Sequence, residues 1–243
     1  MRILLINPNT SENVTDLVTS HVRRIAAPSV DVVPVTARFG ARYIASRAAL
    51  AIAGHAALDC LAEHVEGCDA VYLACFGDPG LYALQEVSPV PVVGMVEASC
   101  RAAAETGRFG IVTGGALWEA MLREIVAVMG LADRFTGVRT IAPTGGEIAR
   151  DPNLALAHLA EACGLCVSED GAEVVILGGA ALAGLAARIQ PHLSVPVICS
   201  VEAGTRAVLA APGAKITQVG ARAAMESIGL GSDLAALLAG RTK

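Results

Sequence analysis

Short apolar runs alternate with longer helical patterns along the first half of the chain. Each run is typical of a strand buried on both faces, and apolar positions three or four residues apart are typical of a helix. We expect strands over 2–6, 31–35, 70–74 and 89–93, and helices over 12–26, 46–66, 81–86 and 97–106. Strands that alternate with helices predict parallel sheets with right-handed crossovers, so the expected fold class is α/β.

The same alternation begins again near residue 108. We expect strands over 108–113, 138–141, 173–179 (with its turn) and 195–198, and helices over 117–129, 153–168, 180–190 and from 201. A last apolar, alanine-rich segment over 216–239 is expected to pack back on the body of the protein.

Landmarks of the first half recur in the same order in the second half. They are Val90-Pro-Val with Val195-Pro-Val, Val96-Glu-Ala with Val201-Glu-Ala, Asp69–Cys75 with Glu173–Gly179, and Ile3–Thr10 with Phe109–Ala116. A period of this length is too long for a solenoid unit. It predicts two similar parallel-sheet α/β lobes related by a pseudo-twofold axis.

A cleft between the two lobes is the expected ligand site, because clefts between such units are common binding sites. We predict that lobe 1 comprises residues 1–96 plus 209–243 and carries Cys75. Lobe 2 is predicted to comprise residues 97–208 and to carry Gly179.

Composition narrows the class of protein. Hydrophobic residues make up 54% of the chain and aromatic residues only 3%, which suits a packed α/β protein with buried parallel strands. The net charge is −5 and the basic residues are scattered, which argues against a nucleic-acid partner. No uncharged apolar segment reaches the ~18 residues of a spanning helix, so no membrane partner is expected. The apolar start, residues 1–6, is too short for a signal peptide, and a cytoplasmic location is expected.

The chain has seven cysteines, an odd number that predicts free thiols in a chain without a signal sequence. Cys163 and Cys166 have C-x-x-C spacing but lie in a helical pattern, with no second pair or His pair nearby. Packing in the core is therefore favoured over a zinc or redox site.

Cys75 has the position most suggestive of chemistry. It ends an apolar run, and the turn formers Gly77 to Gly80 and a short helical pattern follow it. This arrangement places the thiol at the carboxyl end of a strand, where open α/β sheets carry their ligand sites. We expect a nearby helix N-terminus to lower the pKa of the thiol. The alternative is a small, buried, apolar residue, and both interpretations stay open.

The repeat sets Gly179 opposite Cys75 across the predicted cleft. Inversion of a stereocentre through a planar carbanion needs acid–base groups on both faces, and two thiols could supply them. Backbone N–H groups of Phe76 and Gly77, or of Ala180 and Ala181, are candidates to hold the developing enolate charge. No cofactor and no metal are expected if that charge is well stabilised.

Further candidates lie at other strand ends. Asn7 and Thr10 follow the first strand and are expected to reach the cleft, with helix capping as an equal alternative. Thr113 ends the matching strand of the second half and either binds a substrate oxygen or terminates the strand. Asp78 is expected to cap the helix that follows it, with contact to a substrate nitrogen as the alternative.

Four motifs resemble those of the aspartate/glutamate/hydantoin racemase superfamily, and of its hydantoin racemase branch in particular. They are Ile6–Ser11, Ala74–Gly80, Pro91–Gly94 and Leu177–Ala180. The resemblance implies a two-lobed α/β fold, cofactor-independent catalysis and a homo-oligomer. It also implies a small-molecule substrate with a carboxylate or a cyclic imide. One catalytic cysteine of the family falls on Cys75, and the second, in a Leu-Gly-Cys-Ala motif, falls on Gly179.

The chain thus departs from the family pattern at one catalytic position, and three explanations stay open. The first is that the glycine marks an engineered variant, and the second is that Tyr43, His192 or a water molecule replaces the thiol. The third explanation is a one-sided reaction, as in arylmalonate decarboxylases, whose single cysteine lies at the position of Gly179. The leading hypothesis is an isomerase that acts at the carbon next to a carbonyl of an amino acid derivative such as a hydantoin. The alternatives are a single-cysteine lyase and a catalytically impaired variant or binding protein of the same fold.

Overall fold

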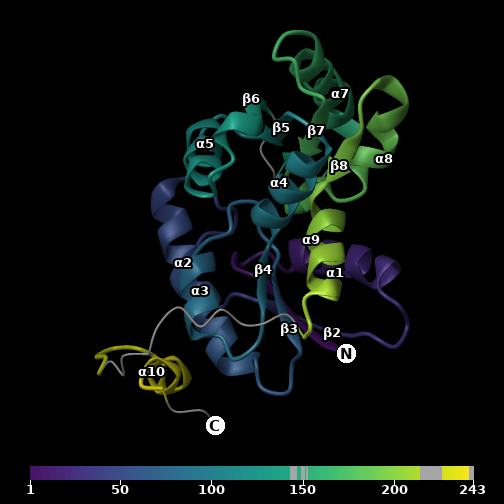
Figure 1. The fold of residues 1–243 in the computed structure, drawn as a ribbon. Coiled ribbons are helices and arrows are strands. Elements are labelled where there is room, and N and C mark those ends of the chain that lie inside the picture. The colour runs from purple at the N-terminus through teal and green to yellow at the C-terminus, as the bar shows by residue number, and fades with distance from the viewer. Residues whose placement is uncertain (143–146, 149–150, 152, 214–225, 241–243) are drawn as a thin grey trace.

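The computed structural model describes residues 1–142, 147–148, 151, 153–213 and 226–240. Its described strands form two four-stranded parallel sheets with helices around them (Figure 1). The predicted α/β class with two similar lobes is confirmed. The exact lobe boundaries, 1–96 plus 209–243 and 97–208, stay a prediction.

The first sheet has the strand order β2-β1-β3-β4, and all its pairs are parallel. Its strands are β1 (Arg2–Asn7), β2 (Asp31–Thr36), β3 (Ala70–Leu73) and β4 (Val92–Gly94). The helices of this half are α1 (Glu12–Ile25), α2 (Arg47–His64), α3 (Leu81–Val87) and α4 (Met95–Thr106).

The second sheet repeats the same topology in the order β6-β5-β7-β8, again parallel throughout. Its strands are β5 (Phe109–Gly114), β6 (Phe135–Ile141), β7 (Val174–Leu177) and β8 (Val197–Cys199). The helices are α5 (Trp118–Val128), η1 (Ala132–Arg134), α7 (Asn153–Ser168), η2 (Ala180–Leu182), α8 (Leu185–Ile189), η3 (Gln190–His192) and α9 (Ser200–Ala210).

The central strands are buried on both faces, which explains their continuous apolar sequences. Every residue of β3 and of β7 is buried, as the run of branched and aromatic side chains predicts. All seven cysteines are free and buried, and Cys163 and Cys166 lie in the core. The prediction that this pair packs in the interior is confirmed.

Helices α4 and α9 join the two halves. They pack against each other (Figure 1). Helix α4 contacts β7 of the second sheet, and helix α9 contacts β3 and β4 of the first sheet. The Tyr72 hydroxyl donates to the carbonyl oxygen of Val201 at 3.4 Å. A Cβ at Gly204 would lie 2.4 Å from that hydroxyl oxygen, so only glycine allows this approach. The two sheets therefore share one continuous core rather than touching at a narrow hinge.

The single helix predicted over 180–190 is wrong. The segment contains η2, a turn at Gly184 with φ +80°, and then the short helix α8. A Cβ at Gly184 would lie 2.6 Å from Cε1 of His21 on α1, so the glycine also permits close packing between the halves. A periodic apolar pattern does not reveal such a break, because the pattern resumes in phase after the turn.

The C-terminal prediction is only partly open to comparison. Helix α10 (Ser232–Leu238) packs against α2, as expected for a segment that returns to the body (Figure 1). Residues 214–225 of the expected segment lie outside the described residues. No described helix has the length and apolar character needed to cross a bilayer.

Candidate active site

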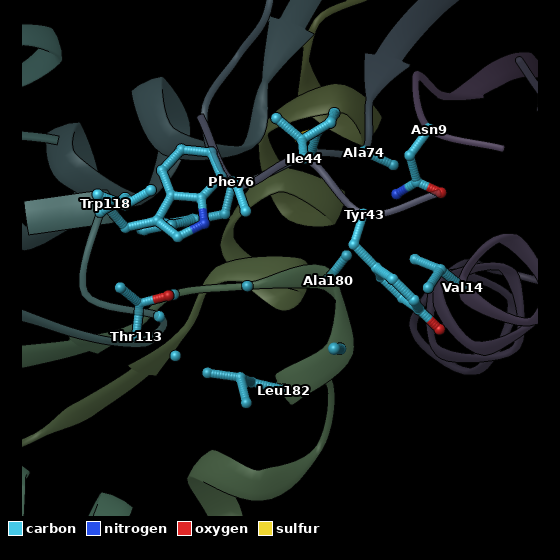
Figure 2. A pocket seen from close by; sticks show the side chains of 18 of the residues that line it. Asn9, Val14, Tyr43, Ile44, Ala74, Phe76, Thr113, Trp118, Ala180 and Leu182 are labelled. Carbon is cyan, nitrogen blue, oxygen red and sulfur yellow. The ribbon is translucent and has the colours of Figure 1, made fainter. Parts of the chain in front are cut away.

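A cavity of ≈ 220 Å³ lies where the carboxyl ends of β3, β5 and β7 meet (Figure 2). Cys75 and Gly179 both line it, so the repeat correctly predicts that the two strand ends share one space. The lining also includes Asn9, Val14, Tyr43, Ile44, Ala45, Ala74, Phe76, Thr113, Gly114, Gly115, Ala116, Leu117, Trp118, Gly178, Ala180, Ala181 and Leu182.

Cys75 is held by a tight turn directly after β3. Its carbonyl oxygen accepts from the N–H groups of Gly77 at 2.9 Å and Asp78 at 3.1 Å, and its own N–H donates to Leu73. Burial, with a smaller contribution from the charge of Asp78, raises the pKa of the Cys75 thiol well above its usual range. The predicted lowering of this pKa is therefore wrong. The physical reason is desolvation of the buried thiol, and the helix that follows it in the chain, α3, begins only at Leu81.

Asp78 caps a helix, but not the one predicted. Its carboxylate accepts from the N–H groups of Val96 at 3.0 Å and Glu97 at 2.7 Å, at the start of α4, whereas Gly80 occupies the N-cap of α3. Burial raises the pKa of Asp78 to about 7, and the hydrogen bonds from α4 oppose this rise. The side chain ties the turn that carries Cys75 to the helix of the next βα unit.

Gly179 has a backbone conformation that favours glycine. Its φ is +145°, and its N–H donates to the Ser200 hydroxyl at 3.1 Å. A Cβ built at this position would lie 3.3 Å from Cγ of Leu182 and 3.9 Å from Oγ1 of Thr113. The turn after β7 is thus shaped for a residue without a side chain, and neighbouring side chains bound the space beside it.

Two aromatic side chains cross between the halves and form the cavity walls (Figure 2). Phe76 lies against Gly178, where a Cβ would come 2.0 Å from Cε1 of the ring. Trp118, at the start of α5, lies against Gly77, where a Cβ would come 2.6 Å from Cη2 of the indole. Each half therefore places an aromatic ring on a glycine of the other half.

Asn7 and Thr10 do not line the cavity, and the expectation that they reach it is wrong. Asn7 Nδ2 contacts Asn9 Oδ1 at 3.0 Å, the carbonyl oxygen of Ser11 at 3.1 Å and Thr15 Oγ1 at 2.9 Å, so its amide is occupied behind the cavity wall. The N–H of Thr10 donates to Ala41.

Only some of the backbone groups predicted to hold the enolate belong to residues that line the cavity. The N–H of Gly77 is occupied by the turn around Cys75, and Gly77 lines a neighbouring cavity instead. Phe76, Thr113, Ala180 and Ala181 do line the central cavity. Ala180 and Ala181 begin η2, and the first N–H groups of a helix have no partner within it.

Sequence reasoning missed several residues of the lining. Asn9 lies in the polar turn that drew attention to Asn7, and Trp118, the single tryptophan of the chain, follows the Gly114-Gly115 turn. Tyr43, named as a possible replacement for the second thiol, lines the cavity. His192, named for the same role, is exposed in η3 and does not line it.

Known proteins resemble this chain in both sequence and structure. The family model described as Asp/Glu/Hydantoin racemase matches residues 3–208. The chain is 34% identical over 214 residues to a hydantoin racemase of Pseudomonas sp. (strain NS671), covering 85% of this chain and 84% of the relative. It is also 34% identical over 211 residues to a hydantoin racemase of Paenarthrobacter aurescens, covering 85% and 89%. The solved structure of an allantoin racemase from Klebsiella pneumoniae matches with a TM-score of 0.85 and 30% identity, covering 94% of this chain and 97% of that one.

Proposed function

Because this chain belongs to the Asp/Glu/hydantoin racemase family, we propose that it uses Cys75 for acid–base chemistry at the carbon next to a carbonyl. The chain is an enzyme of the racemase class of isomerases. The proposed substrate is a 5-substituted hydantoin or a related amino acid derivative, since the curated relatives are hydantoin racemases. We propose that no cofactor takes part, and that the protein works as a homo-oligomer.

The observation that supports the proposal is the placement of Cys75 at a strand end that opens into the shared cavity. Burial raises the pKa of this thiol, so the protonated form, which can donate a proton to a carbanion, is favoured in the protein without a ligand. General acid–base catalysis depends first on placing the side chain within reach of the proton that it transfers. The thiolate would take the proton from carbon, and the resulting thiol would return a proton to the carbanion.

Hydrogen-bond donors would hold the negative charge that develops on the carbonyl oxygen. The N–H groups of Ala180 and Ala181 and the backbone of Phe76 are candidates, and the Thr113 hydroxyl is a candidate to bind another oxygen of the substrate. Donors aimed at a developing oxyanion are among the largest contributions to enzyme catalysis.

Gly179 favours a second candidate function, a reaction that delivers a proton from one face only. Glycine cannot transfer a proton, so the face opposite Cys75 depends on water, on Tyr43 or on no acid at all. A lyase that forms the enolate by loss of carbon dioxide and protonates it from Cys75 would need only the one thiol.

One experiment tests both functions. A single enantiomer of a 5-substituted hydantoin is incubated with the enzyme in heavy water, and optical rotation and deuterium uptake are followed together. Racemisation predicts that rotation falls while deuterium enters. Deuterium uptake with retained rotation would contradict racemisation and support one-sided proton transfer. Release of carbon dioxide from a substituted malonate would support the lyase.

A further inference from the structure

Asn9 presents one fixed end of its amide to the cavity. Its Oδ1 accepts from Asn7 Nδ2 at 3.0 Å and from the N–H of Ser11 at 2.8 Å. Both partners are donors, so the amide oxygen must be the end that faces the loop, and Nδ2 must be the other end. Figure 2 shows the amide nitrogen turned toward Tyr43 and Ala74 and the amide oxygen turned away from them.

The Asn9 side chain is largely buried, and its Nδ2 can still donate hydrogen bonds. The residue is 8% exposed and lines the cavity, and no described residue accepts a hydrogen bond from its Nδ2. A donor that faces a largely apolar cavity and has no protein acceptor is available to an acceptor on a ligand.

The loop holds this donor in place before any ligand arrives. The Asn9 N–H donates to Asn7 Oδ1 at 3.3 Å, and Thr15, which contacts the Asn7 amide, also bonds the hydroxyl of Thr36 at 2.6 Å. Asn9 is thus fixed by its own backbone and by both ends of Asn7. A donor that is already oriented stabilises developing charge without a reorganisation cost.

A second buried polar group faces the cavity from the other half of the chain. Thr113 is 5% exposed, and its hydroxyl is directed into the cavity (Figure 2). No hydrogen bond joins this hydroxyl to any described residue. The cavity therefore offers one polar contact from β5 and one from the loop after β1, separated by apolar walls.

In the described part of the chain, the cavity walls carry no ionisable side chain other than Cys75 and Tyr43. Among the described residues that line the cavity there is no Asp, Glu, Lys, Arg or His. A free amino acid would bring a carboxylate and an ammonium group into this space, and buried charges without partners are strongly disfavoured. An uncharged ring with carbonyl oxygens fits the lining.

We propose that Asn9 is a catalytic residue whose Nδ2–H donates to the carbonyl oxygen next to the reacting carbon of an uncharged cyclic amide. This inference rests on the proposed function. When the thiolate of Cys75 takes the proton, the C–H bond breaks, an S–H bond forms and the electron pair moves onto that carbonyl oxygen. Asn9 stabilises the resulting enolate, and the reverse transfer returns a proton to carbon. Thr113 binds a polar group at the far side of the ring.

The variant Asn9→Asp tests the donor. Aspartate keeps an oxygen to accept from Asn7 and Ser11, but it replaces the N–H donor with a second acceptor. We expect deuterium exchange at the reacting carbon of 5-benzylhydantoin at pH 7.5 to fall by about 10²–10³-fold in kcat, the usual effect of losing one oxyanion donor. KM should change much less. Asn13→Asp, the same substitution at an exposed position of α1, is the matched control and should keep its exchange rate.

Ligand binding to a Cys75→Ser protein, which should not turn the substrate over, tests whether the cavity prefers an uncharged ring. By calorimetry, 5-benzylhydantoin should bind at least about tenfold more tightly than phenylalanine or N-carbamoyl-phenylalanine. Isotope-edited infrared spectra should show the carbonyl stretch of the bound ring, labelled next to the reacting carbon, at lower frequency than in water. Asn9→Asp in the same background should abolish that shift. The carbonyl shift in the Cys75→Ser protein itself does not depend on whether the Asn9 variant folds.

The outcomes separate this inference from the proposed function. Exchange by the wild type that survives Asn9→Asp within about threefold, less than one kcal/mol, would overturn the role of Asn9 and leave the function intact. A ring that binds with the carbonyl shift but never exchanges would support the Asn9 contact and contradict the function. Equal binding of the charged ligands, or no carbonyl shift in the Cys75→Ser protein, would overturn the inference.

Discussion

The turns after β3 and β7 occupy equivalent places in two sheets with the same strand order, yet they are built differently. The turn after β3 carries Cys75 and is fixed by Asp78, whose carboxylate is bound to the start of α4. The turn after β7 carries Gly179 at φ +145° and continues into the short helix η2. In the proposed mechanism, one strand end supplies the group that transfers protons, and the other supplies backbone and space.

The difference shows that two lobes with the same strand order need not carry the same chemical groups at equivalent positions. Both ends open into the same cavity, so the fold brings both to one ligand. Whether an end can act as an acid or base depends on its side chain, and whether it can accept that side chain depends on its backbone. In the turn after β7, Gly179 has no side chain, and its φ of +145° disfavours one.

The largest effect we expect comes from removing the thiol that lines the cavity. Cys75→Ser should lower deuterium exchange of the hydantoin by about 10²–10⁴-fold, the usual contribution of a positioned acid–base group. Mass spectrometry of the recovered substrate measures the exchange. Cys68→Ser is the matched control, since serine can keep the hydrogen bond from this side chain to the carbonyl of His64. Equal loss in both variants would mean that the effect is structural.

The next effect concerns the carboxylate that fixes the β3 turn. Burial raises the pKa of Asp78 to about 7 in the folded protein, above its value in the unfolded chain. The folded state therefore binds the proton more readily. The contribution of Asp78 to stability is present in full at low pH and is lost as the pH rises through about 7.

Denaturant unfolding at several pH values checks this sign. Other carboxylates shift in the opposite direction, as the lowered pKa of Asp170 beside Arg139 illustrates. The useful quantity is thus the free energy of unfolding of the wild type minus that of Asp78→Asn. This difference should fall between pH 4 and pH 7 and then level off. A difference that rises over this range would contradict the raised pKa.

A smaller effect should follow from blocking the contact between the two turns. In Gly178→Ala the new Cβ would lie 2.0 Å from the Phe76 ring, so either the ring or the β7 turn must move. We expect a loss of about 1–3 kcal/mol in the free energy of unfolding, as for overpacked cores. Gly164→Ala, where no atom lies within 4 Å, should instead stabilise helix α7 by about 0.5–1 kcal/mol.

The last substitution, Gly179→Cys, tests the comparison between the two turns most directly. Restoring a thiol at φ +145°, with Leu182 Cγ 3.3 Å from the new Cβ, should cost about 1–3 kcal/mol. If the one-sided reaction operates in the wild type, the variant should add loss of optical rotation to deuterium exchange. Gly179→Ala carries the same strain without a thiol and should not. Loss of rotation in Gly179→Ala would exclude the thiol as its cause.

Much of the site could be predicted from the chain because its signals are local. The apolar run before Cys75 and the turn formers after it correctly placed the thiol at a strand end. The matching run before Gly179 correctly placed the glycine across the same cavity. What failed depends on contacts between distant segments: the burial that raises the pKa of Cys75, and the choice of Asp78 to cap α4 instead of α3.

Side-chain direction was the other failure. Asn7 and Asn9 lie in one turn and have the same chemistry, and no local rule says which of them faces the cavity. The network with Ser11 and Thr15 turns Asn7 inward and leaves Nδ2 of Asn9 free. The aromatic walls from Phe76 and Trp118 likewise depend on glycines that lie opposite them only in the folded chain.

The sequence by itself determined the order of strands and helices, the duplication, and the identity of the one thiol facing a glycine. These follow from periodicity and turn chemistry, which act over a few residues. Only the tertiary structure decided which polar groups meet the ligand, how strongly Cys75 holds its proton, and which helix Asp78 caps. Those properties arise from desolvation and from the directions that packing gives to side chains, so a short window of sequence does not predict them.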